Sequence, residues 1–113
     1  MITRKEDMKL GIREKMRGGN GAARFTGLSA QLPGKLRLFS TIRLTPGSSI
    51  GYHVHEGETE MFYFLQGKGR VRDDEEFKDI AAGDSMATFS GHGHGVENTG
   101  DEDLIFVAAI VLD

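Results

Sequence analysis

The sequence contains no cysteine, no tryptophan and only 2 prolines. Without cysteine the chain has no disulfide, no thiolate metal ligand and no nucleophilic thiol, so we expect a cytoplasmic protein that does not depend on an oxidising compartment. An excess of one charge is missing too, since 14 basic and 17 acidic residues leave a formal net charge of -3. This balance offers no electrostatic footprint for nucleic acid or for an anionic membrane, and we expect neither as a partner.

Long hydrophobic runs are also absent. The longest apolar run, Leu104 to Leu112, has nine residues, about half of what a membrane-spanning helix needs. The first ten residues, MITRKEDMKL, carry scattered charges where a secretory signal has an apolar stretch. We therefore expect neither a membrane span nor a secretory leader.

The length of 113 residues fits one domain with one hydrophobic core. Residues 1–35 are predicted to form an N-terminal arm with an edge strand at Arg24 to Leu28, and residues 36–113 the body of the domain. The glycine cluster at Gly18 to Gly21 lacks the strand, helix and lysine that accompany a phosphate-binding loop. We interpret this cluster as a turn.

Short alternating segments dominate the rest of the chain. Leu36 to Leu44 alternates apolar and polar residues, which is the period of a strand with one buried face. After the turn at Pro46 and Gly47, further strands are predicted at Ile50–His55, Glu60–Gln66, Gly69–Asp73, Phe77–Ile80, Asp84–Phe89, Gly95–Asn98 and Leu104–Leu112. Evenly spaced short strands without a helical period indicate an all-β antiparallel sandwich or barrel. The acidic stretch Asp73 to Glu76 is interpreted as a solvated hairpin turn.

The histidines are the main functional signal. In His53-Val54-His55 the two imidazoles lie two residues apart, so in an extended strand they project from the same face, about 7 Å apart. One metal ion can reach both. Glu60 opens the next apolar strand, where a carboxylate needs a partner.

These spacings resemble the two motifs of the cupin superfamily. The first motif, G-x5-H-x-H-x(3,4)-E-x6-G, is met by Gly47, His53, His55, Glu60 and Gly67. The second motif, G-x5-P-x-G-x2-H-x3-N, is met by Gly83, Gly91, His94 and Asn98, with Phe89 in place of the usual proline. The resemblance implies a small antiparallel jelly-roll barrel.

By the same resemblance, His53, His55, Glu60 and His94 are the expected metal ligands. Three neutral imidazoles and one carboxylate suit a divalent first-row ion such as Mn, Fe, Ni, Cu or Zn and leave coordination positions open for a small molecule. Two nearby residues remain alternatives. His92 competes with His94, although only His94 has the motif's spacing to Asn98, and Glu58 is held in reserve for Glu60.

The resemblance also implies which side chains surround the site. Alternate residues of the strand from Glu60 point into the barrel, so the expected pocket lining is Phe62, Phe64, Met86 and Thr88. The opposite face of this strand, Met61, Tyr63 and Leu65, is also apolar and needs a cover. A homodimer is the predicted cover, with an intramolecular contact as the alternative.

The reaction is not determined by the fold. One hypothesis is a metal-dependent enzyme, a dioxygenase, decarboxylase or isomerase acting on a small oxygen-rich compound. The alternative is a module that binds a small carboxylate or sugar without turnover. Arg37, Arg43 and Tyr52 are candidate ligand holders, and no catalytic residue stands out. Short cupins of this kind resemble domains of oxalate-degrading enzymes, but no residue here identifies oxalate.

Overall fold

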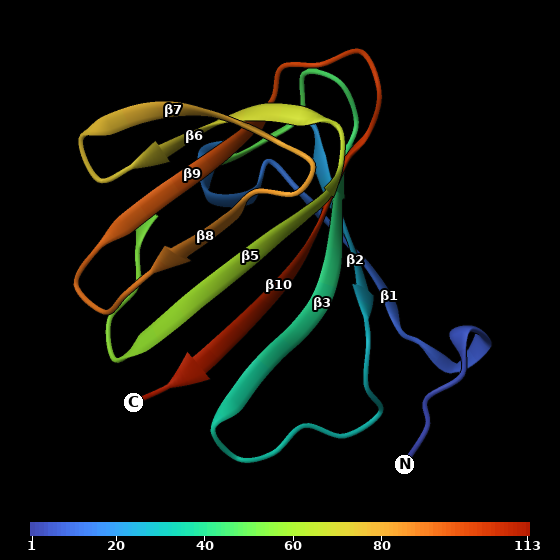
Figure 1. The fold of residues 1–113 in the computed structure, drawn as a ribbon. Coiled ribbons are helices and arrows are strands. Elements are labelled where there is room, and N and C mark those ends of the chain that lie inside the picture. Colours follow the sequence, from blue (N-terminus) through green and yellow to red (C-terminus); the bar gives the residue numbers. More distant parts are fainter.

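The computed structural model describes residues 1–113 as two antiparallel β-sheets that face each other (Figure 1). This confirms the predicted all-β fold. Two short 3-10 helices, η1 (Lys5–Asp7) and η2 (Met16–Gly18), precede most of the strands. The ten strands are β1 (Leu10–Glu14), β2 (Ala22–Gly27), β3 (Leu36–Leu44), β4 (Ser49–Val54), β5 (Glu58–Gln66), β6 (Lys68–Asp73), β7 (Glu76–Ala81), β8 (Ser85–Thr88), β9 (Gly93–Asn98) and β10 (Leu104–Leu112).

The strand order shows how the jelly roll closes. The larger sheet has the order β1-β2-β3-β10-β5-β8 and the smaller sheet the order β4-β9-β6-β7. The last strand, β10, lies between β3 and β5 and pairs with both over most of its length. The consecutive strands β3, β4 and β5 thus alternate between the two sheets, since β3 and β5 belong to the larger sheet and β4 to the smaller.

The core lies between the sheets and follows from the alternation of the three long strands. On β5 the residues with even numbers from Glu58 to Phe64 are buried, while Met61, Tyr63 and Leu65 are exposed. The inward-facing apolar side chains form one cluster, and each of its valine, leucine, isoleucine and phenylalanine side chains contributes about 1.5–3 kcal/mol when fully buried. The cluster consists of Ala23, Ile42, Leu44, Ile50, Phe62, Phe64, Val71, Val96, Leu104, Phe106 and Ala108.

The N-terminal segment is more ordered than the predicted arm. A strand is present near the predicted Arg24 to Leu28, but β2 pairs with both β1 and β3 and is not an edge strand. The edge is β1, which the sequence analysis did not predict. All five residues of β1 are exposed, so the strand carries no alternation between buried and exposed positions for a sequence pattern to reveal.

The remaining strands agree with the predicted positions to within a few residues. The acidic stretch forms the predicted hairpin turn between β6 and β7, where Asp74 has a positive φ of 52°. None of the helices has the length and apolar character required to span a membrane.

Candidate metal centre

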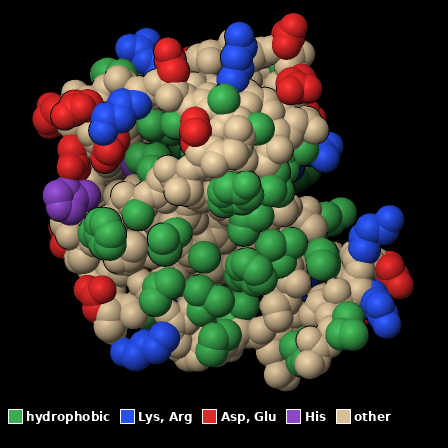
Figure 2. Space-filling model, in the orientation of Figure 1, with side chains coloured by type: hydrophobic (Ala, Val, Ile, Leu, Met, Phe, Trp, Pro, Cys, Tyr) green, Lys and Arg blue, Asp and Glu red, His purple; other side chains and the backbone are tan.

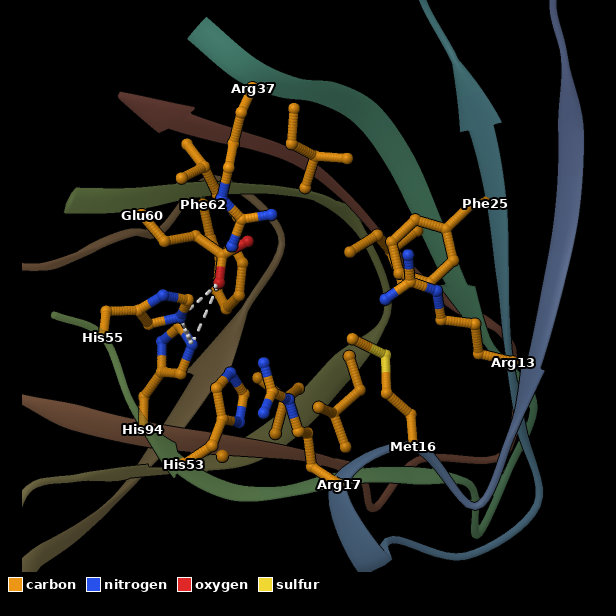
Figure 3. Close-up of a pocket in the computed structure, with 16 residues that line it drawn as sticks. Arg13, Met16, Arg17, Phe25, Arg37, His53, His55, Glu60, Phe62 and His94 are labelled. Atoms are coloured by element: carbon orange, nitrogen blue, oxygen red, sulfur yellow. Dashed lines mark hydrogen bonds and ion pairs between the residues drawn. The ribbon is translucent and has the colours of Figure 1, made fainter. Parts of the chain in front are cut away.

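Four side chains predicted as ligands come together between the two sheets (Figure 3). His53 lies on β4, His55 directly follows that strand, His94 lies on β9 and Glu60 lies on β5. The antiparallel register places His53 opposite His94, and Glu60 reaches them from the facing sheet. One potential ligand atom from each residue falls within 4.8 Å of all the others.

The distances among these atoms fit one small ion. Glu60 Oε1 is 3.1 Å from His55 Nε2 and 3.0 Å from His94 Nε2, and the two Nε2 atoms are 3.1 Å apart. Ligands about 2.1 Å from a first-row ion and at right angles to each other are about 3.0 Å apart. The imidazole of His53 completes the group, with its ring centroid 4.9 Å and 4.8 Å from those of His55 and His94.

A hydrogen bond on the Nδ1 atom fixes the orientation of each imidazole. His53 donates to the Gly51 carbonyl at 2.8 Å. His55 donates to Glu58 Oε2 at 2.6 Å, and His94 Nδ1 bonds to Thr88 Oγ1 at 2.7 Å. Partners of this kind hold the other ring nitrogen of a histidine toward a metal.

Glu58 therefore supports the centre and is not part of the four-residue cluster. Its carboxylate accepts two hydrogen bonds from Arg37, at 2.6 Å and 2.7 Å. These bonds are the main reason that the pKa of Glu58 is lowered to about 2, and the same bond to Glu58 raises the pKa of Arg37. Arg37 is the extra residue of a β-bulge on β3, where Ile110 pairs with Leu38 and Val111 with Leu36. A bulge of this kind redirects a side chain.

The His53 imidazole is held in its neutral form. Its pKa is lowered to about 4, mainly by burial, while the Gly51 carbonyl raises it and the neighbouring His94, His55 and Arg17 add smaller lowering effects. A neutral imidazole has a free lone pair on Nε2 when Nδ1 carries the proton. The donor set of neutral imidazole and carboxylate fits a divalent first-row metal.

A cavity of about 70 Å³ opens next to the four residues, enough for a few water molecules or a ligand with few non-hydrogen atoms. Phe62, one of the predicted lining residues, forms part of its wall and stacks on His94 with ring centroids 5.0 Å apart. Leu38, Ile42, Ile50 and Ile110 add apolar surface.

The other three residues expected to line the pocket, Phe64, Met86 and Thr88, are not among the side chains that line this cavity. Phe64 lies one inward position further along β5, inside the core, where its ring packs on Phe106 at 5.3 Å. Met86 packs against the core cluster. Thr88 is buried behind His94 and serves that imidazole as a hydrogen-bond partner.

The other candidates from the sequence lie in different places. Arg37 lines the cavity. Arg43 instead forms an ion pair with Asp103, with 3.7 Å between Nη1 and Oδ2. The ring of Tyr52 lies under the Arg72 guanidinium, whose Cζ is 3.8 Å from the ring centroid. The alternative ligand His92 is exposed and bonds to Asp74 Oδ2 at 2.6 Å, outside the cluster.

Sequence reasoning missed the contribution of the N-terminal hairpin. Four of its side chains line the cavity, namely Arg13, Met16, Arg17 and Phe25. They reach the site because β1 and β2 extend the larger sheet and η2 packs against β4. No local pattern in residues 1–35 signals this long-range placement.

The comparison with known proteins agrees with this architecture. Residues 40–110 match the family model described as "Cupin domain", so the chain belongs to the cupin family. This confirms the resemblance stated from the two motifs.

The chain is also similar to individual proteins along most of its length. The chain is 41% identical over 114 residues to an oxalate-binding protein of Thermotoga maritima, covering 99% of this chain and 94% of that protein. A crystal structure of a predicted oxalate decarboxylase from Thermotoga maritima, also 41% identical, matches with a TM-score of 0.93 over 100% of both chains. The cupin domain of Schizosaccharomyces pombe Cnp3 matches with a TM-score of 0.76 at 14% identity, over 91% of this chain and 69% of that chain, a likeness of fold alone.

Proposed function

We propose that this cupin binds a small carboxylate, with oxalate as the first compound to test, at a divalent transition metal held by His53, His55, Glu60 and His94. The convergence of these side chains beside a small cavity is the observation that carries the proposal. When bound, such an ion acts as a Lewis acid that accepts oxygen ligands at the positions the protein leaves open. The similarity to an oxalate-binding protein supports oxalate as the ligand.

The charge of the site favours an anion. Three neutral imidazoles and one carboxylate leave a divalent ion with a local charge of about +1. Arg37 adds no free charge because it is paired with Glu58. The apolar wall around Phe62 excludes water and strengthens attraction between the centre and a ligand carboxylate.

Decarboxylation of oxalate is the second candidate function, and the similarity to a predicted oxalate decarboxylase supports it. Of the three reaction types expected from the sequence, namely a dioxygenase, a decarboxylase and an isomerase, this similarity supports the decarboxylase. Binding is the first candidate because Glu60, the only carboxylate in the cavity lining, is itself one of the four proposed metal ligands. The cavity therefore presents no second carboxyl group to carry a proton to the ligand.

The test is calorimetric titration of oxalate into protein loaded with each metal in turn, followed by analysis for formate and carbon dioxide. We expect one oxalate per chain, bound only when metal is present and recovered unchanged. The variant His92→Ala is the matched control, since it removes an imidazole outside the cluster and leaves binding intact. Absence of oxalate binding with every metal would contradict the proposal. Production of formate would show that the protein is a decarboxylase and not only a binding protein.

A further inference from the structure

The cavity lining includes two cationic side chains, Arg13 and Arg17, that are separate from the four-residue cluster. Arg13 lies on β1 and Arg17 on η2, and both line the cavity. Figure 3 shows Arg17 beside His53, and Arg13 on the side away from His55 and Glu60. Both residues are exposed, so their guanidinium groups stand at the mouth of the cavity while the cluster forms its floor.

The protein does not neutralise these two charges. The arginines that form ion pairs with carboxylates are Arg37, Arg43 and Arg72. The Arg13 guanidinium instead lies over the Phe25 ring, 5.2 Å from its centroid. Since Glu60 is the only carboxylate among the lining residues, the mouth presents positive charge to whatever enters.

The backbone that carries Arg17 is held firmly against β4. A Cβ on Gly51 would lie 2.0 Å from the Arg17 carbonyl oxygen, and a Cβ on Gly19 would lie 2.1 Å from that of Ser49. The Ser49 N–H donates to the Asn20 carbonyl at 2.9 Å, and the Asn20 N–H donates to Ser49 Oγ at 2.8 Å. This contact fixes the backbone position from which the Arg17 side chain extends. Less conformational entropy is therefore lost when Arg17 binds an anion.

Charge balance indicates the class of ligand. A divalent ion with Glu60 contributes about +1, and the two unpaired arginines raise the total to about +3. We propose that Arg13 and Arg17 bind a second anionic group of the ligand, one that the four-residue cluster does not hold, so that the ligand of this cavity is a dianion. The inference rests on the proposed function, because it assumes that the first anionic group binds at the metal centre.

The experiment compares dianions with monoanions. Manganese-loaded wild type, Arg13→Gln and Arg17→Gln proteins are titrated calorimetrically with oxalate and malonate, and with acetate and formate. Loss of one charge-assisted hydrogen bond should weaken binding of the dianions about tenfold or more and binding of the monoanions less than about twofold. Arg24→Gln, an exposed arginine outside this cavity, is the matched control. Metal content measured by mass spectrometry should be the same in all four proteins.

Two results would overturn the inference without touching the proposed function. Oxalate binding that is unchanged in both variants removes the arginines from the site. Equal weakening of dianions and monoanions shows a general effect of positive charge and not a second binding position. If the wild-type protein binds no carboxylate with metal present, the proposed function fails, and the inference fails with it.

Discussion

Each imidazole at the centre depends on a neighbour that does not belong to the four-residue cluster. The Gly51 carbonyl, the Glu58 carboxylate and the Thr88 hydroxyl each bond to one Nδ1 atom. Partners of this kind typically change metal affinity 10- to 100-fold when removed. Glu58 has the largest electrostatic role among them, since it also binds Arg37 through two hydrogen bonds.

In the metal-free protein, Glu58→Gln should make the free energy of unfolding depend less on pH in the acidic range. The pKa of Glu58 is lowered from 4.5 to about 2, so its carboxylate stabilises the fold above pH 4.5, and this contribution is lost as the pH falls toward 2. We expect the variant to lose about 2 kcal/mol of unfolding free energy at neutral pH, measured by urea denaturation, and the difference from wild type to narrow below pH 4.5.

The lowered pKa of His53 acts in a higher range, between pH 6.5 and about 4. Because the unfolded chain takes up a proton there before the folded chain does, stability falls as the pH drops through this range. This effect is common to wild type and variant and cancels in their difference. Glu56→Gln, at an exposed neighbouring position, should show no loss. A Glu58→Gln deficit that stays constant down to pH 2 would contradict the account.

Some residues of the site could be predicted from the sequence and others could not. The four clustered residues were predictable because their spacing along β4, β5 and β9 is local and is a motif. Arg13 and Arg17 were not, because their place at the cavity depends on how the N-terminal hairpin pairs with the rest of the larger sheet. Phe64 lies in the core cluster and not at this cavity, because alternation shows which face of the sheet a side chain occupies and not how far along the strand it lies.

At the level of elements, the contact between η2 and β4 joins the N-terminal hairpin to the strand that carries His53. Arg17 has left-handed backbone angles, φ 55° and ψ 32°, and Lys15 has φ 48°. Non-glycine residues in this region each cost about 1 kcal/mol or more. The backbone packing at Gly19 and Gly51 offsets that cost, so the contact should tolerate little change.

Gly51→Ala should disrupt this contact, because its Cβ would lie 2.0 Å from the Arg17 carbonyl oxygen. We expect a loss of about 2 kcal/mol in unfolding free energy from overpacking and weaker oxalate binding as η2 shifts, measured by urea denaturation and calorimetry. Gly11→Ala is the control, since nothing lies within 4 Å of its added Cβ. Equal stability of the two variants would show that the contact does not hold η2 in place.

The strands themselves were predictable wherever one face is buried. β3, β5 and β10 alternate clearly, and β10 shows the inward set Leu104, Phe106, Ala108 and Ile110. The exposed strand β1 gave no such signal, and neither did the bulge on β3 that brings Arg37 to Glu58. Bulges and edge pairing are set by tertiary contacts, which a local pattern does not contain.

At the scale of the whole molecule, the outer face of the larger sheet is strongly apolar. Met61, Tyr63 and Leu65 are each about half exposed, and no intramolecular segment covers them. Figure 2 shows hydrophobic side chains gathered over β5, β10 and β3. A face of this kind is typical of a protein interface, and a homodimer remains our prediction for it.

Light scattering should therefore give a mass of twice 12.4 kDa. The double change Met61→Lys and Leu65→Lys places two charges on the outer face and should shift the protein to monomer without loss of metal, since neither residue lines the cavity. Lys68→Met, on the other sheet, is the control. A wild-type mass near 12.4 kDa over a wide concentration range would contradict the dimer.

The central claim is that His53, His55, Glu60 and His94 hold one transition-metal ion, and metal content tests it most directly. Mass-spectrometric analysis of protein purified without added metal should find close to one ion per chain in the wild type and almost none in the double variant His53→Ala and His94→Ala. The variant should stay folded by circular dichroism, because a core of this size does not depend on a metal as a zinc finger does. Near-stoichiometric metal in the folded double variant would contradict the assignment.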